Sequence, residues 1–287
     1  MRAQRRFRRG NDEAIRVLSQ AIAAPGLSDA DLATAHVNRG YAYFAKGLTD
    51  VAITDYSAAI RLARNDADPQ SLRGWAHFTG GKFKQAIADS TAAIRLDPNL
   101  GFAFRNRGRA QLYAGQARPA ADDFAAAVRL APSDVLGVIW LHVARVRGGQ
   151  ADQQEFTANL AKIDRRTWPG PIADVLSGAL TQDKLGDIAK SAQGEKPQGE
   201  RVCDAQVYLG LLQLAVGDKD EARKLFKAAV EDCPLGVAGD RARGGENGIE
   251  AAGHRAGPCR SQASRTETAN AATSPAANRS VSIARQI

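Results

Sequence analysis

Small and apolar residues recur along this chain at an interval of 34 residues. Two glycine columns, two alanine columns and a column of large rings follow that interval. A fixed period of about 20–50 residues is the signature of a repeat architecture. The columns are Gly40, Gly74, Gly108 and Gly210; Gly47, Gly81, Gly115, Gly149 and Gly217; Ala52, Ala86, Ala120 and Ala222; Ala59, Ala93, Ala127, Ala161 and Ala229; and Tyr56, Phe124 and Phe226, with Ser90 as an exception.

Each column has a physical reason that predicts a helix, a tight turn and a second helix in every unit. Small residues such as Gly40 and Ala52 let two helices approach closely, and Tyr56 fills the gap between neighbouring units. Gly47 separates two helical periods, where the turn requires a positive φ. A helix pair of this kind cannot bury its apolar face alone, so the units are expected to stack into an all-α superhelical solenoid.

The same period sets the expected domain organisation. Residues 33–134 form three regular units, and residues 203–236 form a final one. Between them, a degenerate helix pair precedes an irregular spacer, with short helices near 172–180 and 181–192 and a polar loop over 193–200. The remaining segments are an Arg-rich start with a truncated half-repeat (1–32), the degenerate pair with its spacer (135–202) and a tail expected to be disordered (237–287).

At this stage the repeats resemble the tetratricopeptide repeat superfamily, and segment 101–134 is the fullest match. Three regular repeats, then Ile139-Trp140-Leu141, Trp168-Pro169-Gly170-Pro171 and a last repeat are similar to bacterial envelope lipoproteins of the NlpI type. That resemblance implies a periplasmic adaptor that gathers cell-wall hydrolases and a protease. The chain departs from the pattern because it shows neither an export signal nor a lipid-attachment cysteine.

The net charge of +8 is concentrated at the two ends. Residues 1–9 carry five Arg and no acid, and residues 237–287 carry seven Arg and four acids, which leaves zero for residues 10–236. A nucleic-acid surface needs a basic face on the folded body, so no nucleic-acid partner is expected. Without an apolar segment behind the first arginines, the chain as written is expected in the cytoplasm. A start further upstream with an export signal would instead indicate the periplasm.

Candidate chemistry is sparse, which favours a scaffold over an enzyme. The four His form neither an HExxH motif nor an i, i+4 pair, so no metal and no cofactor are expected. Gly80-Gly81-Lys82 fits the turn between two helices better than a phosphate loop. Repeat solenoids usually present a binding face, so we expect a non-enzymatic protein-protein interaction adaptor. The alternative is an enzyme with an unrecognised site in the irregular region 165–200.

Helical spacing places the binding face on the first helix of each unit, opposite the packing side. Aromatic side chains there supply contact area, amides bond a peptide backbone, and guanidinium groups bond a carboxylate. The column Tyr41, Trp75 and Arg109 is expected to line the concave side. Trp75→Ala and Arg109→Glu are each expected to abolish partner binding without unfolding the chain. The expected groove residues are Asn38, Tyr41, Trp75, Arg105, Asn106, Arg109 and Tyr113.

Two further contacts are expected from the turn geometry. Arginines on the first helices and aspartates on the second helices lie 16 residues apart, on either side of the turn glycine, which predicts a ladder of ion pairs. Cys203 and Cys233 begin and end the final unit, which predicts a disulfide and hence an oxidising compartment. Reduced cysteines are the alternative, and Cys259 has no expected partner. The ladder pairs are Arg39 with Asp55, Arg73 with Asp89, and Arg107 with Asp123.

Overall fold

The computed structural model of the chain describes residues 2–191 and 198–232, and every regular element in these ranges is a helix. The helices are α1 (Arg2–Ala23), α2 (Asp29–Ala45), α3 (Thr49–Leu62), α4 (Ala67–Thr79), α5 (Phe83–Leu96), α6 (Gly101–Tyr113), α7 (Ala117–Leu130), α8 (Val135–Arg147), α9 (Gln153–Leu160), α10 (Gly170–Leu176), α11 (Gln182–Ser191), α12 (Gln198–Ala215) and α13 (Lys219–Asp232). The described part of the chain is thus all-α, as the repeat pattern predicts.

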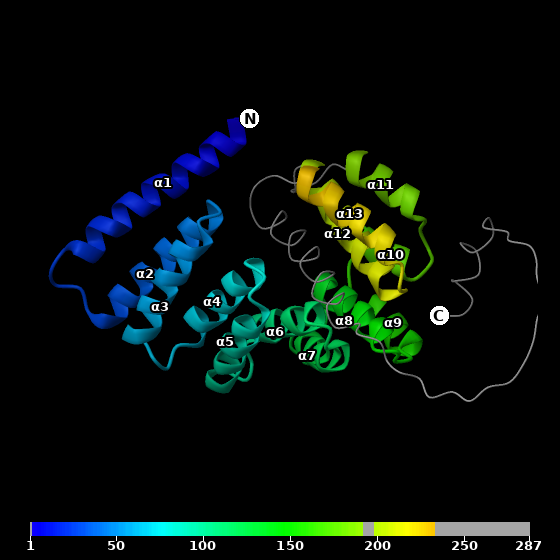
Figure 1. Cartoon of the computed structure of the whole chain (residues 1–287), viewed down its shortest axis with the longest axis horizontal. Helices are drawn as coiled ribbons and strands as arrows, with labels where there is room; N and C mark the ends of the chain where they lie inside the picture. Colours follow the sequence, from blue (N-terminus) through cyan, green and yellow to red (C-terminus); the bar gives the residue numbers. More distant parts are fainter. Residues whose placement is uncertain (1, 192–197, 233–287) are drawn as a thin grey trace, which may run out of the picture.

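Consecutive helices pack as antiparallel pairs that follow one another along an arc (Figure 1). The pairs α2–α3, α4–α5, α6–α7 and α12–α13 make the most extensive contacts, and α5 and α7 each contact the first helix of the next pair. The last pair does not follow α9. Instead α12 packs against α8, and the short α10 lies against both α8 and α12. Helix α1 covers α2 at one end of the arc (Figure 1).

A left-handed glycine makes the turn inside each of these pairs. Gly47 has a φ of +78°, and Gly217 in the last pair has a φ of +90°. The amide of Leu48 donates to the carbonyl of Tyr43 at 3.0 Å, which closes the end of α2 in a Schellman turn. Gly81, Gly115 and Gly149 share the positive φ, so the sequence column at this position is a column of helix ends.

Close approach of the two helices explains the other glycine column. A Cβ built on Gly210 would lie 2.9 Å from Cε1 of Phe226, and one built on Gly40 would lie 2.9 Å from Cε1 of Tyr56. Both rings are almost completely buried. Opposite Gly74 the nearest neighbour is the Ser90 hydroxyl, 2.9 Å from the Cβ position, so a close approach is kept there without a ring.

The structure differs from the expected pattern at two places. Helix α9 ends at Leu160, so Ala161 caps it and is exposed instead of packing in the alanine column. Helix α12 already begins at Gln198, so the last residues of the loop expected over 193–200 are helical. The longer helix carries residues that pack on the spacer, since the Arg201 Nε donates to the Ala189 carbonyl at 3.1 Å. The expected tail, 237–287, lies outside the described residues.

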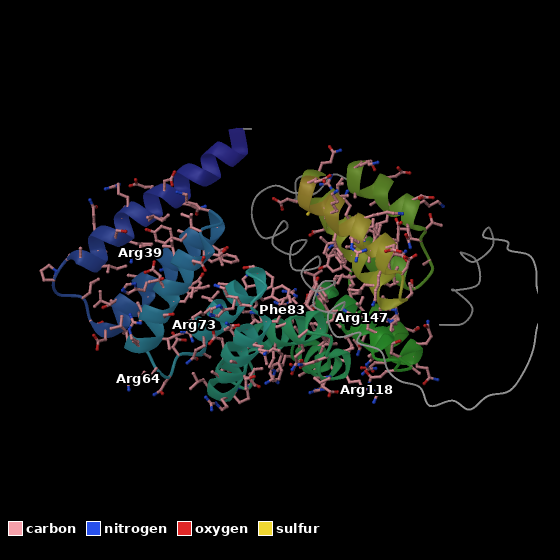
Figure 2. The ribbon with its side chains drawn as sticks, in the orientation of Figure 1. Arg39, Arg64, Arg73, Phe83, Arg118 and Arg147 are labelled. Carbon is pink, nitrogen blue, oxygen red and sulfur yellow. The ribbon has the colours of Figure 1, made fainter. Side chains whose placement is uncertain are left out.

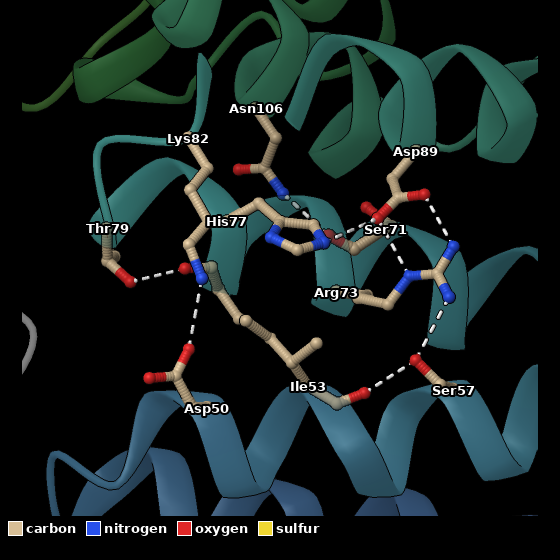
Figure 3. Close-up of polar contacts among 11 residues, drawn as sticks. Asp50, Ile53, Ser57, Ser71, Arg73, His77, Thr79, Lys82, Asp89 and Asn106 are labelled. Carbon is tan, nitrogen blue, oxygen red and sulfur yellow. Dashed lines mark hydrogen bonds and ion pairs between the residues drawn. The ribbon is translucent and has the colours of Figure 1, made fainter. Parts of the chain in front are cut away.

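The three ion pairs of the ladder are present, each with two hydrogen bonds. In the third unit Arg107 donates from Nε and Nη2 to the two carboxylate oxygens of Asp123, both at 2.7 Å. In the second unit Arg73 makes the same fork with Asp89 at 2.8 and 2.7 Å (Figure 3). In the first unit Arg39 donates from Nε and Nη2 to the two carboxylate oxygens of Asp55 at 2.9 and 2.7 Å. The three carboxylates are buried, so each depends on its guanidinium for compensation.

Each of these guanidinium groups also reaches the preceding unit. The Arg73 Nη1 donates to Ser57 on α3 at 3.0 Å (Figure 3), and the Arg107 Nη1 donates to Thr91 on α5 at 3.2 Å. One side chain therefore joins three helices, two in its own unit and one in the unit before. Ser57 and Thr91 lie 34 residues apart, so this second contact of the arginine follows the repeat period as well. The sequence analysis considered only the pairing of arginine with aspartate.

We expect Gly210→Ala to lower the free energy of unfolding by about 1–3 kcal/mol, because the new methyl group must displace the buried Phe226 ring. Gly186→Ala on α11 is the matched control, since nothing lies within 4 Å of its Cβ position. That control should raise stability by about 0.5–1 kcal/mol. Urea denaturation of both variants measures the difference, and equal effects would contradict the close-approach explanation.

A double-mutant cycle tests the ladder. Arg107→Leu leaves the buried Asp123 without its cation, and we expect a cost of about 2–3 kcal/mol. Adding Asp123→Leu should recover part of that loss, because the last unit carries Leu209 and Leu225 at these two positions. The control cycle uses the exposed pair of Lys82 and Asp50, whose coupling should stay below about 1 kcal/mol. Equal coupling in the two cycles would refute the role assigned to burial.

The pH dependence of stability should include a contribution from His77. Burial lowers the pKa of His77 below its ordinary value of 6.5, and the charges of Arg73 and Lys82 act in the same direction. The carboxylates of Asp89 and Asp50 oppose this shift. Because the unfolded chain binds the proton more strongly, His77 removes stability as the pH falls below about 6.5.

We therefore expect His77→Gln to lose less stability between pH 7 and pH 5 than the parent chain. Glutamine suits the site because Gln111 occupies the same column one unit later and is buried there. The slope of the unfolding free energy against pH should fall by less than about 1.4 kcal/mol per pH unit, the limit for one proton. Denaturant titrations at several pH values measure it, and identical profiles would exclude His77 as the source.

Candidate functional site on the inner face

The expected groove column of Tyr41, Trp75 and Arg109 is only partly open. Tyr41 on α2 is 60% exposed, whereas Trp75 on α4 and Arg109 on α6 are 8% and 6% exposed. The guanidinium of Arg109 lies 5.1 Å from the ring centre of Trp75 and 5.2 Å from that of Trp140 on α8. This stacking between two rings corrects the expectation that Trp75 and Arg109 face a partner, and substituting either should disturb packing.

Aromatic side chains continue this packing from the second unit to the last. Trp75 stacks on Phe78 with ring centres 5.2 Å apart, and Phe78 meets Tyr113 edge-on at 5.3 Å. Tyr113 lies 6.3 Å from Trp140, which in turn meets Tyr208 on α12 at 5.8 Å. Such pairs add stabilisation beyond their area, so this run joins α4, α6, α8 and α12 in one continuous core.

Two more of the expected groove residues serve contacts within the chain. Asn106 has no exposed surface, and its Nδ2 donates to the Ser71 carbonyl on α4 at 3.3 Å (Figure 3). Arg105 forms an ion pair with Asp134, the residue that caps α8. Tyr113 is 2% exposed, whereas Asn38, close to Tyr41 on α2, is exposed. The first unit therefore offers the most accessible part of the expected face.

Arg147 lies in the same helical column as Tyr113 and is not among the groove residues expected from the sequence. It follows Tyr113 by 34 residues at the last turn of α8 (Figure 2), in a unit whose weak repeat pattern gives no signal for this position. Its Nη1 donates to the Leu112 carbonyl at the end of α6 at 3.3 Å. Burial lowers the pKa of Arg147 below its ordinary value. The half-buried guanidinium is thus a desolvated cation on the inner side of the repeats.

The remaining candidate residues take structural positions. His142 and Asp152 are both buried with Nδ1 and Oδ2 2.7 Å apart, and the imidazole stacks on Phe156 at 3.9 Å between ring centres. In the irregular region 165–200, the Trp168 indole donates to Asp204 on α12 at 3.1 Å. Within the described ranges, no three side chains among His, Cys, Asp and Glu gather closely enough to hold a metal ion.

Cys203 is completely buried in α12, whereas Cys233 and Cys259 lie outside the described residues. The expected disulfide between Cys203 and Cys233 therefore stays a prediction. None of the helices in the described ranges combines the length and the apolar character that crossing a membrane requires.

Several solved structures are similar to this chain. MamA 41-end from Desulfovibrio magneticus RS-1 is 19% identical and has a TM-score of 0.43, with 70% of this chain and 94% of that chain covered. The first TPR of Spaghetti (RPAP3), bound to the HSP90 peptide SRMEEVD, is 22% identical with a TM-score of 0.39, covering 47% and 97%. YrrB, a TPR protein with an unusual peptide-binding site, is 16% identical with a TM-score of 0.41, covering 74% and 91%.

The family match is carried by the first part of the chain. Residues 2–71 and residues 37–101 each match the family model of the tetratricopeptide repeat. These residues contain α1 and the pairs α2–α3 and α4–α5, which have the glycine turns and the arginine ladder described above. The similarity to the tetratricopeptide repeat therefore covers residues 2–101 of this chain.

Proposed function

We propose that this chain is a non-catalytic interaction scaffold. It holds a segment of a partner protein against the inner side formed by the first helix of each unit. Solenoids of stacked helix pairs present extended surfaces that suit this role. The same face carries Tyr41, Asn38 and Arg147, which can supply contact area, amide hydrogen bonds and a positive charge. No chemistry beyond binding is required of these residues.

The observation that carries the proposal is the exposure of Tyr41. Its counterparts Trp75 and Arg109 in the following units are buried by their neighbours, whereas 60% of the Tyr41 surface remains open. Large rings are usually covered in a solenoid, and an open one with a polar tip is a frequent anchor in protein interfaces. A peptide that covers Tyr41 would bury this ring as Arg109 buries Trp75.

The resemblance to envelope lipoproteins of the NlpI type supports a finer version, in which the scaffold is an adaptor in the bacterial cell envelope. The order of its units and the predicted bridge between Cys203 and Cys233 support that location, because disulfides persist in oxidising compartments. Partners in the envelope would then be proteins of the periplasm. Titration of thiols in the denatured, unreduced chain bears on this version separately from binding.

Selection from a displayed library of random 12-residue peptides tests the binding function. We expect the parent chain to enrich a set of sequences, and Tyr41→Ala to reduce their recovery at least about 10-fold, the effect of losing an aromatic anchor. The melting temperature should stay close to that of the parent, because the Tyr41 ring contributes little buried surface.

The matched control is Leu96→Ala, which removes another exposed apolar side chain, at the end of α5. Its recovery of the selected peptides should equal that of the parent. Failure to enrich any peptide, or equal recovery by Tyr41→Ala and the parent, would overturn the proposal.

A further inference from the structure

Helix α1 makes the contacts of a second helix in a repeat unit. The Arg39 Nη1 donates to the Ser19 hydroxyl on α1 at 3.1 Å. In the next unit the Arg73 Nη1 donates to Ser57 on α3 in the same way. Ser19 and Ser57 are 38 residues apart, so α1 aligns with α3 at this offset.

The side of α1 that corresponds to the buried side of α3 is uncovered. At the offset of 38 residues Val17 corresponds to Asp55, which is 4% exposed, but Val17 itself is 46% exposed. Ala14 and Ala21 correspond to alanines of α3 with no exposed surface, yet both are only half-buried. Helix α1 packs on α2, and no described helix lies along its outer side (Figure 1). An apolar face is therefore available to another helix.

Small and apolar residues continue this face along the whole of α1. They recur at alternating intervals of four and three residues, the spacing of a coiled-coil seam. Gly10 is exposed, and nothing lies within 4 Å of its Cβ position, whereas Gly40 lets the neighbouring helix approach closely. Gly186 on α11 has equally open surroundings, but α11 has no seam of this kind. The seam positions of α1 are Ala3, Phe7, Gly10, Ala14, Val17 and Ala21.

This seam is complementary to itself when a second α1 runs antiparallel to the first. About a two-fold axis at residue 12, positions 3, 7 and 10 of one copy meet positions 21, 17 and 14 of the other. Small residues then meet small residues at two of the three matched positions, and the two larger ones, Phe7 and Val17, share the third. Such a face suits an isologous contact between identical chains.

The charges of α1 favour the same orientation. Residues 1–9 carry five arginines, which a parallel pair would place side by side. In the antiparallel pair these arginines lie beside residues 15–22 of the other copy, where Arg16 is the one charged residue. Arg16 is already compensated, since its Nε donates to the Glu13 carboxylate at 2.9 Å. The antiparallel contact therefore avoids most of the repulsion.

We propose that two copies of this chain associate through antiparallel α1 helices. Helix α1 of each copy covers the side of the other α1 that a first helix covers in the later units. The contact goes beyond the proposed function, because its surface is α1 and not the inner face. Helix α1 is about 33 Å long at 1.5 Å per residue and is already held on α2, so little ordering is needed on association.

Sedimentation equilibrium of the full chain tests this association. The parent should change from monomer to dimer between about 1 and 100 μM. Val17→Glu places a charge on the seam and should weaken dimerisation at least about 10-fold. The matched control is Val51→Glu on α3, where the valine is 44% exposed, and it should dimerise like the parent. Helix content measured by circular dichroism should be the same in all three chains.

Mixtures of variants test the antiparallel orientation. Phe7→Lys mixed with Val17→Glu should form a heterodimer, because the new lysine and the new glutamate meet while the other matched pair is unchanged. Phe7→Lys mixed with Phe7→Glu is the control, since positions 7 of the two copies meet only in a parallel pair. The first mixture should associate at least about 10-fold more tightly than the second.

Each outcome decides the proposal. A parent that stays monomeric throughout the concentration range overturns it, and binding of that monomer to vesicles of acidic phospholipid, lost in Val17→Glu, would assign the face to lipid instead. Equal dimerisation of Val17→Glu and Val51→Glu would place the interface elsewhere. Tighter association of the mixture of Phe7→Lys with Phe7→Glu would overturn the antiparallel orientation.

Discussion

The distance between the two helices of each pair is the constraint on which the rest of the structure depends. Where glycine faces a ring, as Gly40 faces Tyr56, the backbone comes so near that even a methyl group would meet the ring at 2.9 Å. That approach aligns Arg39 with Asp55 for a two-bond ion pair. It also sets the surface on which the next pair stacks. A change in this spacing would therefore disturb both the ladder and the stacking of units.

In the last unit the two helices approach as closely as in the others, but the ion pair is absent. Gly210 faces Phe226 at the same short distance, but Leu209 and Leu225 stand where the other units have arginine and aspartate. Burying a charged pair costs desolvation that an apolar pair avoids, so the replacement is physically reasonable. In the first three units the polar version gives an additional link, since each arginine also binds a hydroxyl of the preceding unit. The last unit instead packs on α8, α10 and α11, with Tyr208 meeting the Trp140 ring and Arg201 donating to the Ala189 carbonyl.

Much of this fold could be predicted from the sequence because the period repeats the same contacts. Gly47 and Gly81 mark the turns, and the 16-residue offset from Arg73 to Asp89 places those two side chains beside each other across the turn. The groove was harder to predict, because a helical face shows only direction. Whether a side chain on that face is open depends on the neighbouring units, and Arg109 on α6 is covered by two rings from other units, Trp75 on α4 and Trp140 on α8.

The stacking of one guanidinium between two indoles has a spectroscopic consequence. The chain contains three tryptophans, and the ring centres of Trp75 and Trp140 lie 5.1 and 5.2 Å from the same guanidinium, on helices separated by a whole unit. A small change in the curvature of the arc between α4 and α8 would alter how the charge is shared by the two rings. Since indole emission responds to nearby charge, we expect the fluorescence of Trp75 and Trp140 to change when the packing between α4 and α8 changes.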